Sequence, residues 1–255
     1  MPDASSQIVA ENLELAYGDF VIQKNLNFEI GRGDIFIIMG GSGCGKSTLM
    51  KSMIGLKSPA QGDVFYNGVP FWSSDVEQQE TMKRSFGTTF QAGALWSSMT
   101  LAENISLALR QYTELSDTDI RDVVAYKLML VGLAGFEDYY PSEISGGMMK
   151  RAGLARAMAL DPEILFFDEP SAGLDPISAK LLDDLILELR DSLGTTVVIV
   201  THELASIFDI GNNSVFLDPV TKTQLATGDP KDLRDNHENV VVRNFLQRGM
   251  AETTT

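Results

Sequence analysis

Apolar and polar residues alternate along the first part of the chain in the manner of β-strands. The pattern begins at Ile8 and returns between Val21 and Ile30. It ends in the wholly apolar run 35–39, which is typical of a strand buried on both faces. Segment 62–68 predicts another short strand that ends in an Asn-Gly turn. The N-terminal part is therefore predicted to be rich in strands.

Helical periodicity takes over between about 100 and 160. Apolar residues such as Ile120 and Leu128 recur there at helical spacing. Ser116 and Asp119 stand before this pattern with the spacing of a capping box, which predicts that a helix begins after Ser116. This middle part is expected to form a helical subdomain.

Strand and helix patterns alternate in the second half. Runs 164–167 and 197–200 are wholly apolar, and between them an amphipathic helix is predicted to stop at Gly194. Continuous apolar strands that alternate with helices indicate an α/β fold with a mainly parallel sheet covered on both faces. The tail 251–255 is polar and is expected to fray.

Composition narrows the class of protein. The chain has 255 residues, and no apolar stretch approaches the roughly 18 to 20 residues that a bilayer-spanning helix needs. The N-terminus lacks the basic start and apolar core of a secretory signal, and one cysteine excludes an internal disulfide, so a cytoplasmic location is expected. A net charge of −15 argues against nucleic acid as the main partner and against direct adhesion to anionic lipid.

A phosphate-binding motif follows the apolar run 35–39. Residues 40–47 fit the pattern G-x-x-x-x-G-K-[ST], directly after a predicted strand and before a predicted helix. Glycines let successive N–H groups point at phosphate oxygens, and the helix adds its positive end. Lys46 is expected to neutralise the β- and γ-phosphates of ATP, and the Ser47 hydroxyl to ligate Mg²⁺. The expected nucleotide-binding residues here are Gly40, Gly41, Ser42, Gly43, Cys44, Gly45, Lys46, Ser47 and Thr48.

Two acids end the apolar run 164–167. Ligands bind at the carboxyl ends of strands in open α/β sheets, which is where Asp168 and Glu169 stand. We expect Asp168 to help hold Mg²⁺ and Glu169 to orient or deprotonate the attacking water.

Segment 144–151, ISGGMMKR, resembles the LSGGQ signature of ATP-binding-cassette (ABC) proteins, with Met148 in place of the usual Gln. This resemblance implies a P-loop ATPase of the ABC type, with an antiparallel β subdomain beside the parallel sheet. It also implies a homodimer in which Ser145, Gly146 and Gly147 of one chain face the γ-phosphate held by the other.

Other positions match further ABC elements. The resemblance implies that Tyr17 stacks on adenine and that Gln91 touches Mg²⁺ or the attacking water. It likewise implies that Asp175 communicates across the dimer and that His202 contacts the γ-phosphate. It covers essentially 8–230, and the whole of 1–255 is expected to form one ABC ATPase domain, with a helical subdomain at about 100–160 and a C-terminal extension at about 231–255.

A narrower resemblance concerns the transported substrate. Segment 90–100, FQAGALWSSMT, resembles the FQxGALFxxxT pattern of ATPases that serve MCE-protein lipid transporters, with Trp96 in place of Phe. Met148 and the ending 241–246 are similar to that group as well. The resemblance implies a motor at the cytoplasmic face of a bacterial inner membrane. Its implied partners are a membrane permease, an MCE protein and a small regulatory subunit, and its implied substrate is phospholipid.

Two alternatives use the same ATP chemistry: the ATPase of a small-solute importer, and a soluble ABC ATPase with no transport role. Extra domains or long coiled coils mark many of the latter, and no sustained heptads occur here.

Two positions allow opposite interpretations. Cys44 is either a small filler beneath the loop or, beside Lys46 and a helix N-terminus, a reactive thiol whose thiolate is favoured. The apolar cluster Ala94, Leu95 and Trp96 either packs in the core or docks the permease.

Overall fold

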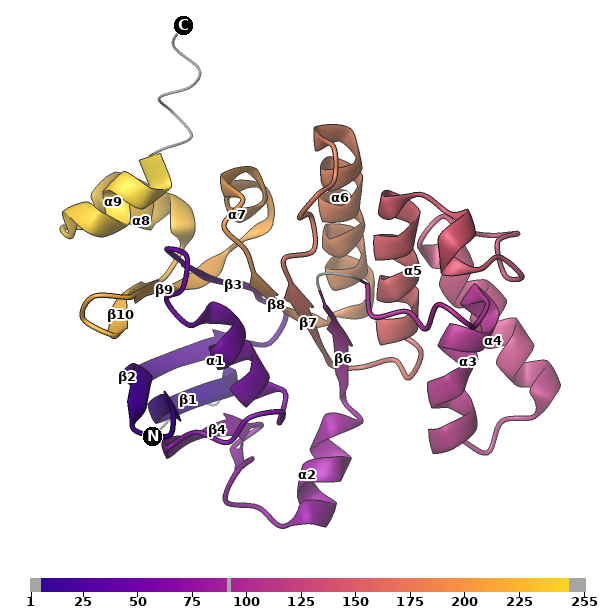
Figure 1. The fold of residues 1–255 in the computed structure, drawn as a ribbon, viewed down its shortest axis with the longest axis horizontal. Helices are drawn as coiled ribbons and strands as arrows, with labels where there is room; N and C mark the ends of the chain where they lie inside the picture. Colours follow the sequence, from indigo (N-terminus) through magenta and orange to yellow (C-terminus); the bar gives the residue numbers. More distant parts are fainter. Residues whose placement is uncertain (1–5, 91–92, 248–255) are drawn as a thin grey trace, which may run out of the picture.

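A computed structural model describes residues 6–90 and 93–247, and two sheets organise them (Figure 1). The larger sheet runs, in spatial order, β10 (Thr223–Thr227), β9 (Asn213–Asp218), β3 (Ile35–Gly40), β8 (Thr196–Val200), β7 (Ile164–Asp168) and β6 (Phe86–Thr89). All neighbouring pairs in it are parallel except β10 with β9.

A smaller, antiparallel sheet lies beside it. It runs β2 (Phe20–Gly31), β1 (Ser6–Tyr17), β4 (Gln61–Tyr66) and β5 (Val69–Pro70). The predicted α/β class, with a mainly parallel core sheet and an antiparallel part, is therefore confirmed.

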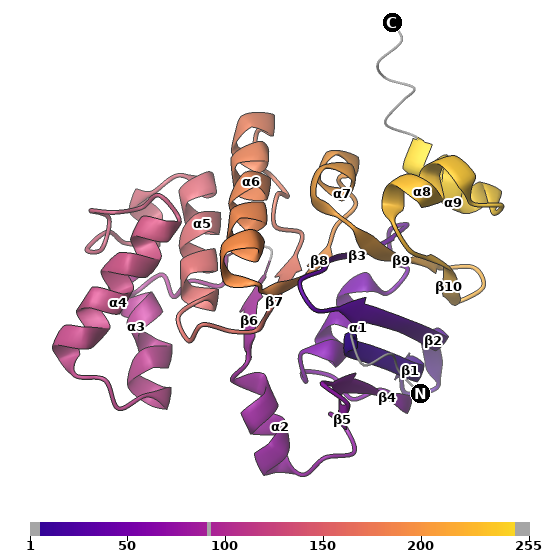
Figure 2. The same cartoon turned by 180° about the vertical axis from the view of Figure 1, so that it is seen from behind.

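The helices of the described residues are α1 (Lys46–Met53), α2 (Val76–Lys83), α3 (Leu101–Tyr112), α4 (Asp117–Leu130), α5 (Gly146–Ala157), α6 (Pro176–Leu193), α7 (Leu204–Ile210), α8 (Pro230–Asn236) and α9 (Val240–Gln247), with a 3-10 turn at Pro141–Glu143. Helices α3, α4 and α5 gather at one end of the large sheet, beyond β6 (Figure 2). Helix α1 lies between the two sheets, whereas α5, α6 and α7 lie on the opposite face of the large sheet (Figure 1). The described part contains no helix that is both long and apolar enough to cross a bilayer.

The position of β3 between β9 and β8 explains why its sequence is apolar throughout. Its alternate side chains Ile35, Ile37 and Met39 belong to the core beneath α5 and α6. Phe36 and Ile38 belong instead to the core that both sheets share with α1. All five are fully buried, as expected for a central strand covered on both faces.

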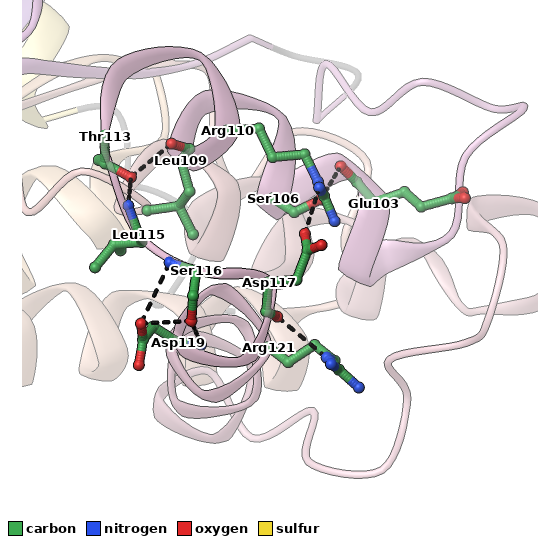
Figure 3. Close-up of polar contacts among 10 residues, drawn as sticks. All are labelled: Glu103, Ser106, Leu109, Arg110, Thr113, Leu115, Ser116, Asp117, Asp119 and Arg121. Atoms are coloured by element: carbon green, nitrogen blue, oxygen red, sulfur yellow. Dashed lines mark hydrogen bonds and ion pairs between the residues drawn. The ribbon is translucent and has the colours of Figure 1, made fainter.

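The predicted helix signals are confirmed at α4 and α6. The Ser116 hydroxyl accepts a hydrogen bond from the Asp119 N–H at 3.2 Å, and the Ser116 N–H donates to the Asp119 carboxylate at 3.2 Å (Figure 3). An ion pair of 2.6 Å between Arg110 and Asp117 joins α3 to α4 across their short connection. Gly194 ends α6 in a left-handed conformation.

Candidate functional site

A cleft of about 770 Å³ opens where three adjacent parallel strands end. The phosphate loop follows β3, Asp168 ends β7, and His202 lies two residues beyond β8, so the sheet order β3-β8-β7 brings them together. From the predicted site, the residues that line the cleft are Gly40, Gly41, Ser42, Gly43, Gly45, Lys46, Ser47, Thr48, Asp168, Glu169 and His202.

The phosphate loop closes tightly onto the start of α1. Gly45 precedes the helix at φ 100°, and a Cβ there would lie 2.5 Å from Ile22 Cγ2, so only glycine fits without strain. Lys46 folds back over the loop, and its ammonium group donates to the Gly40 and Gly41 carbonyls at 3.0 and 3.2 Å. The first N–H groups of α1 and the Lys46 charge together form an anion-binding site.

Cys44 faces away from this cleft. Its side chain is only 1% exposed and packs in the core shared with α1. Burial raises the pKa of the Cys44 thiol, and the nearby Lys46 charge lowers it by less. The interpretation of Cys44 as a favoured thiolate is therefore wrong, and the filler interpretation holds. The Cys44 carbonyl accepts a 2.7 Å hydrogen bond from the buried Gln23 amide, a contact that no sequence motif predicts.

Both the backbone and the side chain of Glu169 make polar contacts. Its backbone has φ 50°, and its N–H donates to the Val200 carbonyl at 2.8 Å. Its Oε1 lies 2.8 Å from His202 Nδ1, while its Oε2 is buried and has no hydrogen-bond partner among the described residues. The Glu169 carboxylate is therefore fixed beside the cleft by its contact with His202.

The oxygen donors beside Lys46 suit Mg²⁺. The Ser47 hydroxyl lies 3.3 Å from Asp168 Oδ1 within the cleft. No group of three or more acids, cysteines or histidines within 6–90 and 93–247 forms an all-protein metal cage. Mg²⁺ commonly uses one or two protein oxygens together with substrate phosphates and water, so the donor set fits this ion.

Lys150 adds a positive charge near the acids. Its ammonium group donates to the Glu169 carbonyl at 3.4 Å. Burial lowers the pKa of Lys150, whereas the charges of Glu169 and Asp168 act in the opposite direction. Lys150 belongs to the signature segment 144–151, where no sequence pattern predicts a role for it.

The signature and Asp175 form a second group outside the cleft. Ser145 caps α5 by accepting from the Met148 N–H at 3.3 Å, and Asp175 caps α6 by accepting from the Ser178 N–H at 3.0 Å. A Cβ at Gly147 would lie 3.5 Å from Ser178 Oγ, so the two helix starts adjoin. Ser145, Gly146, Gly147 and Asp175 do not line the cleft of their own chain.

Tyr17 and Gln91 complete the list of predicted site residues. Gln91 lies outside the described residues. Tyr17 is 53% exposed and does not line the cleft; instead the Lys57 ammonium lies 4.0 Å from the centre of its ring. The adenine-stacking role of Tyr17 stays a prediction.

Residues 93–94, shortly after Gln91, contact α5. Arg156 donates to the Ala94 carbonyl at 2.8 Å, and a Cβ on Gly153 would lie 2.6 Å from the Gly93 oxygen. Leu95 packs against the core, whereas Trp96 is 56% exposed. Core packing therefore describes Leu95 but not Trp96.

The sequence does not predict that three aromatic or basic residues line the cleft. Phe20 begins β2, Lys222 lies in the β9–β10 turn, and Phe245 belongs to α9. No local motif marks them, because the folding of distant segments brings them to the cleft.

Comparison with known proteins defines the class. The ABC transporter family matches residues 23–172. The MlaF intermembrane phospholipid transport ATP-binding protein of Escherichia coli K12 is 37% identical over 235 residues, which cover 92% of this chain and 86% of that protein. MlaF of Haemophilus influenzae is 36% identical over 240 residues, 94% of this chain and 90% of that protein.

Another relative differs in its named substrate. The probable ribonucleotide transport ATP-binding protein mkl of Mycobacterium leprae is 37% identical over 239 residues, 94% of this chain and 68% of that protein.

Solved structures agree on the fold. The dimeric ATP-binding cassette MJ0796, in a post-hydrolysis state with ADP and Pi, has a TM-score of 0.79 at 27% identity and covers 87% of this chain and 98% of its own. The structure of cbiO1 from Clostridium perfringens has a TM-score of 0.83 at 27% identity and covers 97% of each chain. The chain belongs to the ABC transporter family. It is an ATP-hydrolysing subunit of a transporter.

Proposed function

We propose that this ATPase drives phospholipid transport between the inner membrane and an MCE protein. The observation that carries the proposal is the similarity to two proteins named MlaF, which extends over 86% and 90% of their lengths. The FQAGALW segment and Met148 of the signature point the same way. Ribonucleotide transport is the second candidate, because mkl is equally similar over a smaller share of its own length.

Hydrolysis in this proposal begins with a water molecule beside Glu169. The Glu169 carboxylate accepts the proton as the water oxygen attacks the γ-phosphorus, and the bond from that phosphorus to the ADP oxygen breaks. His202 holds the other carboxylate oxygen, and Lys46 neutralises phosphate charge. Ser47 and Asp168 would hold Mg²⁺, which would supply further neutralisation of the phosphate oxygens.

In this proposal the signature residues and Asp175 complete the nucleotide site of a partner chain in a dimer. Ser145 and Gly147 begin α5 outside the cleft of their own chain, where a helix N-terminus with open N–H groups is available to an anion. We propose that they cap the γ-phosphate held by the partner chain, with Asp175 beside the contact. The dimeric ABC cassette similar to this chain supports the arrangement.

A groove beside the segment after Gln91 is the proposed permease site. It measures about 350 Å³ and lies between α2, β6, α3 and α5. Exposed Leu107 and Tyr112 supply apolar surface, and Arg84 and Arg156 supply positive charge. Arg156 also donates a hydrogen bond to the Ala94 carbonyl. A permease helix bound in this groove would therefore contact a residue that is joined to the segment after Gln91. In this proposal the docked chain lies at the cytoplasmic face of the inner membrane.

The coupling test uses Trp96→Ala, in the segment that Arg156 joins to this groove, in the complex with its permease. Because Trp96 is 56% exposed, the variant should keep the wild-type melting temperature and the detached ATPase activity, yet lose lipid transport. Tyr126→Ala, which removes a 49% exposed aromatic from α4, is the matched control and should transport normally. Normal transport by the Trp96 variant, or a collapsed melting temperature, would contradict docking through Trp96.

The substrate test is direct. The ATPase purified with its membrane partners should move labelled phospholipid between proteoliposomes and an MCE protein when ATP is supplied. ATP-dependent uptake of labelled ribonucleotide, with no phospholipid movement, would reject the lipid proposal in favour of the second candidate. Mass analysis of the purified complex would also show whether a small regulatory subunit accompanies it.

A further inference from the structure

One fully buried position of β2 is polar. Leu26 and Ile30, the other fully buried residues of this strand, are apolar, whereas Gln23 is an amide that is 0% exposed. Burying an amide costs free energy unless its polar atoms are hydrogen-bonded, and the Gln23 Oε1 has no partner among the described residues. The two hydrogen bonds that the amide does make therefore indicate what Gln23 contributes.

The Gln23 amide nitrogen donates to carbonyls of two distant segments. One bond, of 2.7 Å, goes to Cys44 in the phosphate loop, and the other, of 3.0 Å, goes to Asp218 at the end of β9. Strand β9 is a neighbour of β3 in the large sheet, and Gly40, where the loop begins, pairs with Leu217. Gln23 therefore joins the middle of the loop to the strand that pairs with the start of the loop.

Cys44 points inward in the phosphate loop. It is the one residue of segment 40–48 that does not line the cleft, and its side chain packs in the core shared with α1. Its carbonyl points inward as well, toward Gln23. In a trans peptide the carbonyl and the following N–H point in opposite directions, so the Gly45 N–H points toward the cleft, which Gly45 lines.

Glycine at position 45 makes this peptide easy to rotate. Gly45 has φ 100°, and because it lacks a Cβ it adopts positive and negative φ with similar ease. Rotation of the Cys44–Gly45 peptide would aim the Cys44 carbonyl oxygen at the phosphates in place of the Gly45 N–H, which would exchange attraction for repulsion. The Gln23 amide opposes this rotation, because the carbonyl would have to give up its buried hydrogen bond.

We propose that Gln23 is a positioning residue for ATP binding and hydrolysis, which holds the Cys44–Gly45 peptide with the Gly45 N–H toward the phosphates. The proposal rests on nucleotide binding in this cleft and is independent of the transported substrate. Gln23 is fully buried beneath the loop and does not line the cleft. It therefore acts on the phosphates only through the peptide that it holds.

Calorimetry with the full chain measures the effect on phosphate binding. Gln23→Met keeps the length of the side chain but removes both hydrogen bonds, so it should bind Mg-tripolyphosphate about tenfold more weakly than wild type. Mg-ADP should lose affinity by about the same factor, because both ligands place phosphates in the loop. Gln23→Asn is one methylene shorter and cannot reach both carbonyls from the same backbone. It should lose affinity as well, which keeps the test available if the methionine variant does not fold.

Gln7→Met is the matched control. Gln7 of β1 is 2% exposed, and its amide donates to Glu163 at 3.1 Å and accepts from the Thr196 hydroxyl. Thr196 begins β8, so these bonds lie at the edge of the large sheet opposite the phosphate loop. The control loses the bonds of another buried amide and should still bind both ligands like wild type, whatever its melting temperature.

NMR of the chain labelled with ¹⁵N-glycine observes the held peptide itself. In wild type and in Gln7→Met, Mg-tripolyphosphate should move the Gly45 amide proton downfield, because the N–H gains a hydrogen bond to a charged oxygen. In Gln23→Met this shift should be lost or much reduced.

The outcomes separate a positioning role from a merely structural one. Affinities of Gln23→Met within about twofold of wild type would overturn the proposal. An undiminished Gly45 shift in that variant, an equal loss of affinity in Gln7→Met, or a loss confined to Mg-ADP would overturn it as well. A wild-type chain that binds neither ligand would contradict nucleotide binding in the cleft, which is a failure of the premise.

Discussion

A buried carboxyl between α6 and α7 allows a stability prediction. Asp183 is 3% exposed; its Oδ2 accepts from the Ser206 hydroxyl at 2.8 Å, and its Oδ1 has no hydrogen-bond partner in the described part of the chain. Burial raises the pKa of Asp183 to about 6, and the charges of Asp209 and Asp184 act in the same direction. The Ser206 hydrogen bond and Lys180 act against it.

The raised pKa has a definite sign for stability. The folded chain binds the Asp183 proton more tightly than the unfolded chain, so the free energy of unfolding falls as pH rises from about 4 to about 6. A shift of about 2 units corresponds to a penalty of about 3 kcal/mol once the carboxyl is ionised, and to about half of that at pH 5.

Asp183→Asn removes this penalty while keeping the shape and an acceptor for Ser206. We expect the stability of the variant relative to wild type to rise by about 1.5 kcal/mol between pH 5 and pH 8, together with a pH-independent cost of burying the amide NH₂ at the position of the unpartnered Oδ1. Urea unfolding at both pH values measures it, provided that the m-value is unchanged. Asp184→Asn, an exposed neighbour on α6, should change stability by less than about 1 kcal/mol. A stability difference between the variant and wild type that does not change between pH 5 and pH 8 would refute the reasoning.

Two further predictions concern the cleft and the signature. Gly147→Leu should abolish hydrolysis yet leave ATP affinity of the single chain near wild type, because Gly147 does not line its own cleft; a large loss of affinity in equilibrium binding would contradict the shared site. Cys44 should resist maleimide in the folded protein and react after unfolding, because it is 1% exposed and burial raises the pKa of its thiol; mass spectrometry of labelled protein decides, and rapid labelling of the native chain would contradict the filler interpretation.

Features encoded locally could be predicted from the sequence. The start of α4 at Ser116 and the end of α6 at Gly194 depend on nearby residues, and both are confirmed. The apolar run of β3 predicted a central strand because a strand buried on both faces has no polar side. The phosphate loop was predictable for the same reason, since strand, turn and helix are contiguous.

Features that depend on tertiary structure could not be predicted. Lys222 reaches Phe20 only through the pairing of β9 with β10 and the bond from β2. Asp183 resembles any polar residue of an amphipathic helix until α7 covers it. Cys44 was open to the opposite interpretation because sequence shows the neighbouring Lys46 but not the burial that outweighs it.

The most direct test of ATP hydrolysis in this site is Glu169→Gln. The amide keeps the shape of the side chain but cannot accept the proton from water, so turnover should fall by about 100-fold or more while ATP remains bound. Single-turnover kinetics, with size-exclusion chromatography in Mg-ATP, should show slow hydrolysis and an accumulated ATP-bound dimer. Near-wild-type turnover would show that Glu169 is not the base and would contradict the account.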